Sequence, residues 1–257
     1  MCWPRWPGPG TTARSGHERA RERTVDHRLA PVQVPAERQR GRGVNWFLNH
    51  IDLIVEKTGQ HLVISLLPVL FGLIISLPLG WLAGRNPIAR AVLIPVSALL
   101  YTIPSLAMFV FLPLILGTQI IDPVNVIVAL TIYTVSLLVR AIADALSVVD
   151  ASILAAATAM GYRPARRFLA VELPLAVPVL ISNLRVATVS NISLATVGSV
   201  IGIEGLGKLF SEGFQRQNLD EIVTGVVLVV VLALIIDLVL QLVGRAITPW
   251  TRTAVKS

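Results

Sequence analysis

Five apolar stretches dominate this sequence, and each is long enough to cross a lipid bilayer as a helix. They cover residues 61–83, 91–116, 124–146, 175–201 and 222–244. A helix rises 1.5 Å per residue, so about 20 residues cross the hydrocarbon core. The composition agrees, because 54% of the residues are hydrophobic, 14% are charged and the mean hydropathy is +0.73. The pattern predicts an all-α polytopic membrane protein with about five spans.

Charge and cysteine content exclude several other classes of protein. The formal net charge is +7, but residues 1–43 hold nine arginines against four acidic side chains, which leaves residues 44–257 close to neutral. Proteins that bind nucleic acid concentrate positive charge on their folded part, so this distribution argues against a nucleic-acid partner. Cys2 is the single cysteine, and no Cys/His cluster has metal-ligand spacing. We therefore expect no metal site and no cofactor.

The residues before the first span divide into two parts. Residues 1–43 show neither apolar periodicity nor a signal-peptide core, so we expect them to be disordered or an artefact of an over-long reading frame that truly starts at Val44. Residues 44–60 place apolar side chains at helical spacing and predict an amphipathic helix at the outer face, or alternatively an ordinary helix packed against a span. The transmembrane domain is expected over residues 61–250, followed by a cytoplasmic tail at 251–257.

Basic residues in the loops predict the orientation of the chain. The loops and flanks that follow spans one, three and five carry nine Arg or Lys residues, whereas the opposite side carries three. Cytoplasmic loops of membrane proteins hold such an excess of positive charge. The bias places the loop at 155–174 and the C-terminus in the cytoplasm, and residue 44 outside.

The loop at 155–174 reads AAATAMGYRPARRFLAVELP. Gly161 allows the positive φ of a tight turn and Pro164 suits the first turn of a helix, which favours two short helices. The spacing resembles the EAA signature of the membrane subunits of bacterial ABC importers, except that Ala155 stands where the signature has glutamate. The resemblance implies docking on a separate cytoplasmic ATPase, whereas the alternative is an ordinary basic loop. The implied coupling residues are Ala156, Ala157, Gly161, Arg163, Arg166, Arg167, Val171, Leu173 and Pro174.

A wider resemblance covers about residues 60–250. The segments 171–189, 195–213 and 232–243 are similar to permeases of osmoprotectant importers, which carry glycine betaine, choline, carnitine or proline betaine. The resemblance implies a type I ABC importer fold in a bacterial inner membrane, with ATPase subunits, a second permease (homodimer or heterodimer) and an extracytoplasmic solute-binding protein as partners. The alternatives are a methionine-type or other amino-acid importer permease, and a membrane scaffold without transport activity.

Catalytic motifs are incomplete in this sequence. Residues 202–209, GIEGLGKL, match a phosphate-binding P-loop except that Leu209 replaces the Ser or Thr that would hold Mg²⁺. We expect a glycine-rich turn at the outer mouth there. The four histidines precede or begin the first span, so no Ser/His/Asp set can be assembled within the membrane. The chain is not predicted to be an enzyme, and ATP hydrolysis is expected from another polypeptide.

Polar residues inside the spans are the remaining functional candidates, because each is costly in lipid unless it faces protein or water. In a helical projection an arc of about 120° holds Ser182, Arg185, Thr188, Thr196 and Ser199. This seam predicts a face of the translocation path, although hydroxyl side chains also mediate helix packing. Arg185 and Asp237 share a depth and are expected to pair, the alternative being that they face different partners. The candidate residues are Arg185, Thr188, Asn191, Thr196 and Asp237.

Overall fold

The computed structural model describes residues 47–249, and every regular element within them is a helix. The predictions for residues 1–43 and for the tail at 251–257 fall outside this range. Along the chain the elements are α3 (Ile51–Arg85), α4 (Pro87–Thr102), α5 (Ser105–Leu116), α6 (Pro123–Ser147), α7 (Ala151–Ala159), α8 (Pro164–Arg167), a π-helical turn (Phe168–Glu172), α9 (Leu173–Val197), a 3₁₀ turn (Gly198–Ile201), α10 (Gly207–Gln215) and α11 (Leu219–Ile247).

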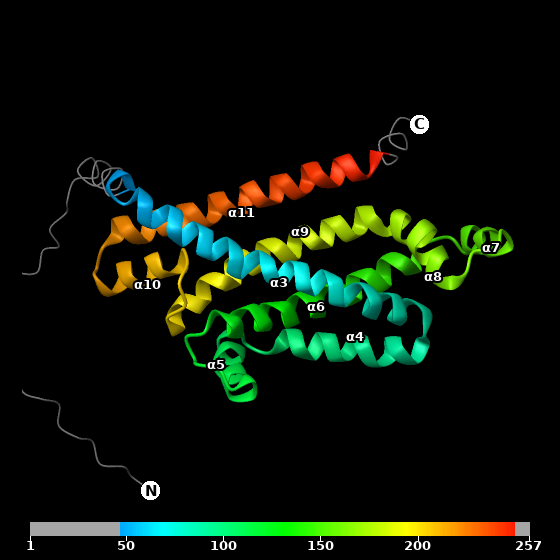
Figure 1. Cartoon of the computed structure of the whole chain (residues 1–257), viewed down its shortest axis with the longest axis horizontal. Coiled ribbons are helices and arrows are strands. Elements are labelled where there is room, and N and C mark those ends of the chain that lie inside the picture. Colours follow the sequence, from blue (N-terminus) through cyan, green and yellow to red (C-terminus); the bar gives the residue numbers. More distant parts are fainter. Residues whose placement is uncertain (1–46, 250–257) are drawn as a thin grey trace, which may run out of the picture. The chain divides into compact units, whose positions relative to one another are not determined.

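Four helical segments among the described residues are long and apolar enough to cross a membrane, or five if α4 and α5 together count as one span. The four are α3, α6, the run from Pro164 to Ile201, and α11. Figure 1 shows these long helices lying side by side, with α6 between α3 and α4. The predicted all-α polytopic architecture is confirmed.

The core of the bundle forms around α6. Its Val126, Ala129 and Leu130 side chains are fully buried. Close approach by α3 is possible because α3 presents glycine where the two helices touch: a Cβ added at Gly72 would lie 2.4 Å from the Thr134 side chain. Small residues at such contacts let membrane helices pack closely, since lipid provides no hydrophobic drive for their association.

Residues 51–60 belong to the first span. The helix α3 runs from Ile51 to Arg85 without a break, so the predicted boundary between residues 60 and 61 does not exist in the structure. Burial explains the continuity: Ile54 is 6% exposed and His61 is 1% exposed, and the His61 Nε2 atom lies 3.1 Å from the Ile192 carbonyl oxygen of α9. Residues 51–60 therefore form one helix with the span that follows, and Ile54 is the one buried residue among them.

The second apolar stretch, expected to form one span over residues 91–116, is divided into two helices. It breaks at Ile103 and Pro104, where α4 and α5 meet at an angle of 104°. Ile103 is extended (φ −65°, ψ 130°), as the residue before a proline prefers. The Tyr133 hydroxyl of α6 donates a hydrogen bond of 2.5 Å to the Ile103 carbonyl oxygen. This bond satisfies a backbone carbonyl at the break. Inside a membrane such groups must find their hydrogen-bond partners within the protein.

Candidate functional site

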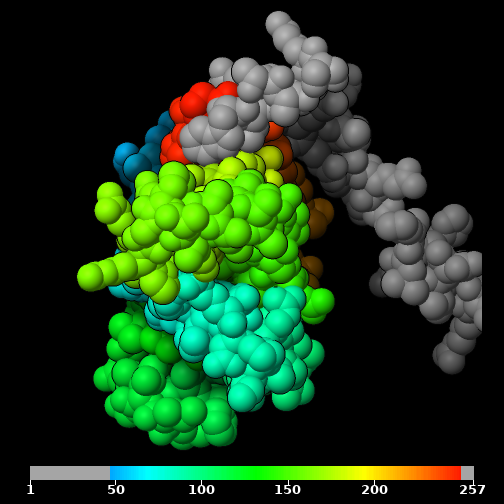
Figure 2. Space-filling view, turned by 90° about the vertical axis from the view of Figure 1, so that its right-hand side faces the viewer, coloured from blue at the N-terminus to red at the C-terminus, as the bar shows by residue number. Residues whose placement is uncertain are grey.

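The helix α7 begins the predicted coupling segment, residues 155–174. Asp150 caps it, because its Oδ1 accepts a 2.8 Å hydrogen bond from the Ser152 backbone N–H, and this bond lowers the pKa of Asp150 below its ordinary value. Ala157 is the one residue of α7 that is buried. Figure 1 shows α7 and α8 at the end of the bundle opposite α10, and Figure 2 shows them at the surface of that end. Most of α7, including Ala156, is thus available to another molecule.

A tight turn separates α7 from α8, as the sequence predicts. Gly161 has a φ of +82°, and the Tyr162 backbone N–H donates back to the Ala157 carbonyl oxygen at 3.2 Å. Nothing lies within 4 Å of the position that a Gly161 Cβ would occupy. Glycine is therefore required here by the backbone conformation and not by crowding. Pro164 then begins α8, where its missing N–H costs no helical hydrogen bond.

The three arginines of the segment separate into two groups. Arg163 and Arg166 are exposed, and the Arg166 guanidinium lies 5.1 Å from the centre of the Tyr162 ring. Arg167 turns inward, where its Nε donates to Glu172 at 2.9 Å and its Nη1 donates to the Thr158 hydroxyl at 2.6 Å. The exposed pair can meet a partner, whereas Arg167 ties the two short helices to the span that follows.

Glu172 was not among the site residues predicted from the sequence. The residue is 5% exposed, and its carboxylate accepts hydrogen bonds from both Arg167 and Arg85, the latter at 2.6 Å from the Nη2 atom. The available signal was that Glu172 is the single acidic residue in residues 155–174. Its partner Arg85 lies 87 positions earlier in the chain, so no local pattern could identify the contact.

The fourth span, predicted to begin at residue 175, is continuous with the second short helix. The chain runs helically from Pro164 to Ile201, through the π-helical turn in which the Leu173 N–H donates to the Phe168 carbonyl oxygen. Pro174 has no N–H to donate to the Ala170 carbonyl, so the ordinary helical bond is impossible at that step. The π turn widens the helix just before this point.

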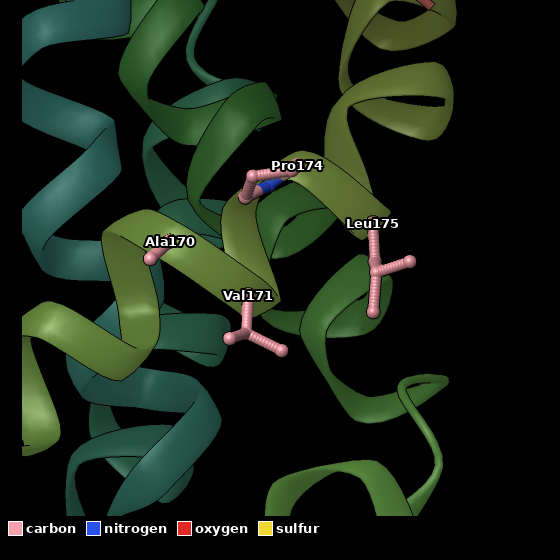
Figure 3. Close-up of a pocket in the computed structure, with 4 residues that line it drawn as sticks. All are labelled: Ala170, Val171, Pro174 and Leu175. Atoms are coloured by element: carbon pink, nitrogen blue, oxygen red, sulfur yellow. The ribbon is translucent and has the colours of Figure 1, made fainter. Parts of the chain in front are cut away.

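A shallow hollow of about 290 Å³ lies over this junction, lined by Ala170, Val171, Pro174 and Leu175. Figure 3 shows the Val171 and Leu175 side chains projecting to the same side of the helix. Val171 and Pro174 are residues that the signature spacing had singled out. Leu173, on the adjacent face, packs half-buried against the apolar cluster between α6 and α9.

Arg185 of α9 and Asp237 of α11 form a two-point salt bridge. The Arg185 Nε atom lies 2.7 Å from Asp237 Oδ1, and its Nη2 atom lies 2.6 Å from Oδ2. The two side chains are 30% and 29% exposed. The pair therefore connects two membrane-spanning helices and stays open on one side.

The other members of the polar seam do not share one environment. Thr188 is buried, and so is Asn191, a candidate residue outside that arc whose amide donates to the Thr134 hydroxyl of α6 at 2.8 Å. Thr196 is half-buried and donates to the Ser193 carbonyl oxygen, while Ser182 is exposed. The seam therefore does not form a single surface, because Thr188 and Ser199 are buried whereas Ser182 is exposed.

Residues 202–206 form a turn between the 3₁₀ turn and α10, with φ values of +93° at Gly202 and +140° at Gly205, and residues 207–209 begin α10. Glu204 accepts hydrogen bonds from Lys57 of α3 and Lys208 of α10. Burial opposes the ionisation of Glu204, but the bonds from Lys208 and Lys57 outweigh it and lower the pKa of that carboxyl. The segment ties α10 to α3 and does not take the strand–loop–helix form of a P-loop.

Known proteins are similar to this chain in sequence and in fold. Residues 76–253 match the family described as "Binding-protein-dependent transport system inner membrane component". The choline transport system permease protein OpuBB of Bacillus subtilis (strain 168) is 34% identical over 196 residues, covering 76% of this chain and 89% of that protein. The carnitine transport permease protein OpuCB of Listeria monocytogenes is 31% identical over 186 residues, covering 72% of this chain and 84% of that protein.

A solved structure gives the same fold. A chain of the inward-facing MetNI methionine ABC transporter superposes with a TM-score of 0.70 at 25% identity, covering 78% of this chain and 98% of that chain. The predicted type I importer fold is therefore confirmed. In this family ATP hydrolysis belongs to separate ATPase subunits, and a substrate-binding protein is a further partner. The chain belongs to the binding-protein-dependent transport family and is a multi-pass permease component of an ABC importer.

Proposed function

We propose that this permease imports quaternary-amine compatible solutes such as glycine betaine, choline, carnitine or proline betaine. The observation that carries the proposal is the similarity to permeases named for these solutes, at 34% identity over three quarters of the chain. A quaternary ammonium group is usually bound by an aromatic cage. Only 6% of the residues are aromatic, so the selective capture step belongs to the separate binding protein and this chain provides passage.

The coupling segment is the surface that meets the ATPase in this proposal. The helix α7 presents nearly all of its side chains outward, and Arg163 and Arg166 add exposed positive charge beside it. Because Ala155 replaces the signature glutamate, any salt bridge from that position to an ATPase is absent. Recognition then depends on the shape of the two short helices, the two exposed arginines and the hollow beside Val171 and Pro174.

The orientation follows from charge. Figure 1 shows the C-terminal end of α11 on the same side as α7, and α10 with the start of α3 on the opposite side. The first side carries most of the loop arginines and is assigned to the cytoplasm. We place the N-terminus outside and a second permease, identical or related, beside this one, so that the translocation path runs between the two subunits.

Uptake measurements test the substrate class. The chain is expressed together with the ATPase, the binding protein and any second permease encoded beside it, in cells that lack osmoprotectant uptake of their own. Uptake of labelled choline or glycine betaine is expected, with competition by other quaternary amines and none by methionine. Competition by methionine or other amino acids, without effect of the quaternary amines, would assign the chain to the amino-acid importers instead.

A further inference from the structure

We propose that Glu172 is a positioning residue that connects the coupling segment to the first span, so that movement of α7 and α8 on the ATPase moves the end of α3. This inference rests on the proposed docking of the coupling segment. It adds a route by which the docked segment acts on the membrane-spanning helices.

Glu172 forms a bridge between two arginines. Its Oε1 atom accepts from Arg85 Nη2 at 2.6 Å and from Arg167 Nε at 2.9 Å. Arg85 is the last residue of α3, and Arg167 is the last residue of α8. One carboxylate oxygen thus joins two guanidinium groups that belong to different parts of the chain. Charge-assisted bonds of this kind are short and directional.

The bridge continues on both sides of Glu172. Outward, Arg167 Nη1 donates to the Thr158 hydroxyl of α7 at 2.6 Å. Inward, the Arg85 guanidinium lies 4.8 Å from the centre of the Trp81 ring, which packs against the Phe168 ring at a centroid distance of 5.6 Å. An unbroken series of contacts therefore runs from α7 through α8 and the π turn to the last turn of α3.

The location of the bridge makes it suited to transmit motion. Apart from Ala157, the residues of α7 are not buried, so its tertiary contacts give little rigid support. The π turn between Arg167 and Leu173 is also a wider form of helix that is mostly limited to a single turn. Such turns are often found at functional sites. Without Glu172, α7 and α8 could pivot about this turn while α3 stays in place. With Glu172, the same movement pulls on Arg85.

The test measures solute imported per ATP hydrolysed in the assembled transporter, reconstituted in proteoliposomes with its binding protein. Glu172→Gln keeps the shape of the side chain and removes the charge that both arginines contact. We expect basal ATPase activity to persist while import per ATP falls about fivefold or more, within the range of coupling between distant sites. Glu172→Asp retains the charge and is expected to restore part of the loss.

Two further variants separate coupling from folding. Thr158→Val removes the outermost contact from an exposed position, so it is expected to lower import per ATP without lowering thermal stability. Asp144→Asn is the matched control, because it breaks the exposed Arg90–Asp144 bridge between α4 and α6 at the same end of the bundle. Its ratio of import to hydrolysis should equal that of the wild type.

The outcomes distinguish this inference from the proposed function. If the wild type imports the solute and Glu172→Gln and Thr158→Val both keep a normal import ratio, Glu172 is merely structural and the inference is overturned. If Glu172→Gln fails to assemble, Thr158→Val alone decides in the same way. If the wild type shows no import of any quaternary amine, the proposed substrate class fails, and the ratio is then measured with the solute that the binding protein does carry.

Discussion

Gly161 is the residue on which the shape of the coupling segment depends. Its φ of +82° lies in a region that costs other residues about 1–2 kcal/mol and a β-branched residue more. Gly161→Val is therefore expected to leave membrane insertion intact but to displace α7 relative to α8. Substrate-stimulated ATPase activity of the assembled transporter should fall, while basal activity remains.

Two controls make the Gly161 test specific. Gly161→Asn should retain coupling, since asparagine tolerates a positive φ better than other residues. Gly59→Val places the same side chain in a helix where nothing lies within 4 Å of the new Cβ, and it should behave as the wild type. Normal substrate stimulation in Gly161→Val would exclude the segment as the coupling surface.

The pair formed by Arg185 and Asp237 gives a second prediction at this scale. Both charges lie inside membrane spans, where an ion without a partner is costly. Arg185→Ala and Asp237→Ala are each expected to lower uptake and the detergent unfolding temperature. The exchanged double variant, Arg185→Asp with Asp237→Arg, should recover part of both. Strictly additive damage would show that the pair does not act as a unit and would leave Arg185 as a candidate pathway residue.

At the scale of elements, the contact between α3 and α6 depends on two glycines. Both lie on the face of α3 that meets α6. A Cβ at Gly72 would lie 2.4 Å from Thr134, and one at Gly80 would lie 2.5 Å from the Ile142 Cβ. Both neighbours are β-branched and cannot move aside. Each glycine-to-alanine change is expected to cost about 1–3 kcal/mol of stability through overpacking.

Thermal unfolding in detergent measures this effect. The unfolding temperature should fall for Gly72→Ala and Gly80→Ala and fall further for the double variant. Gly59→Ala is the matched control on the same helix, because its Cβ would meet nothing within 4 Å. An unchanged unfolding temperature in the double variant would mean that α3 and α6 are farther apart in the membrane than in this structure.

At the scale of the molecule, the orientation in the membrane can be tested by cysteine labelling. In a Cys2→Ser background, single cysteines replace Leu219 at the start of α11 and Val148 after α6, which are 67% and 83% exposed. A membrane-impermeant maleimide should label Leu219→Cys on intact cells and Val148→Cys only after permeabilisation. The reverse pattern would invert the assigned topology and remove the coupling segment from the cytoplasm.

Much of this architecture follows from local features of the sequence. Hydrophobicity over about 20 residues identifies a span wherever it lies, because the bilayer imposes the same length on every crossing helix. The turn at Gly161 is equally local, since the conformation of one residue decides it. The resemblance to the family signature suggested the coupling role that we propose, and the depth of Arg185 and Asp237 in their spans was enough to suggest that they pair.

Other features depended on contacts between distant segments. Proline is tolerated inside α3 at Pro68 but accompanies a 104° break at Pro104, where the Tyr133 hydroxyl of α6 satisfies the Ile103 carbonyl. Likewise Asn191 is buried where α9 meets α6, and its amide donates to the Thr134 hydroxyl there. Hydropathy gives the length of a helix but not its rotation about its own axis or the neighbour it meets. Packing alone determines these, and it brings Glu172 to Arg85 across 87 positions of sequence.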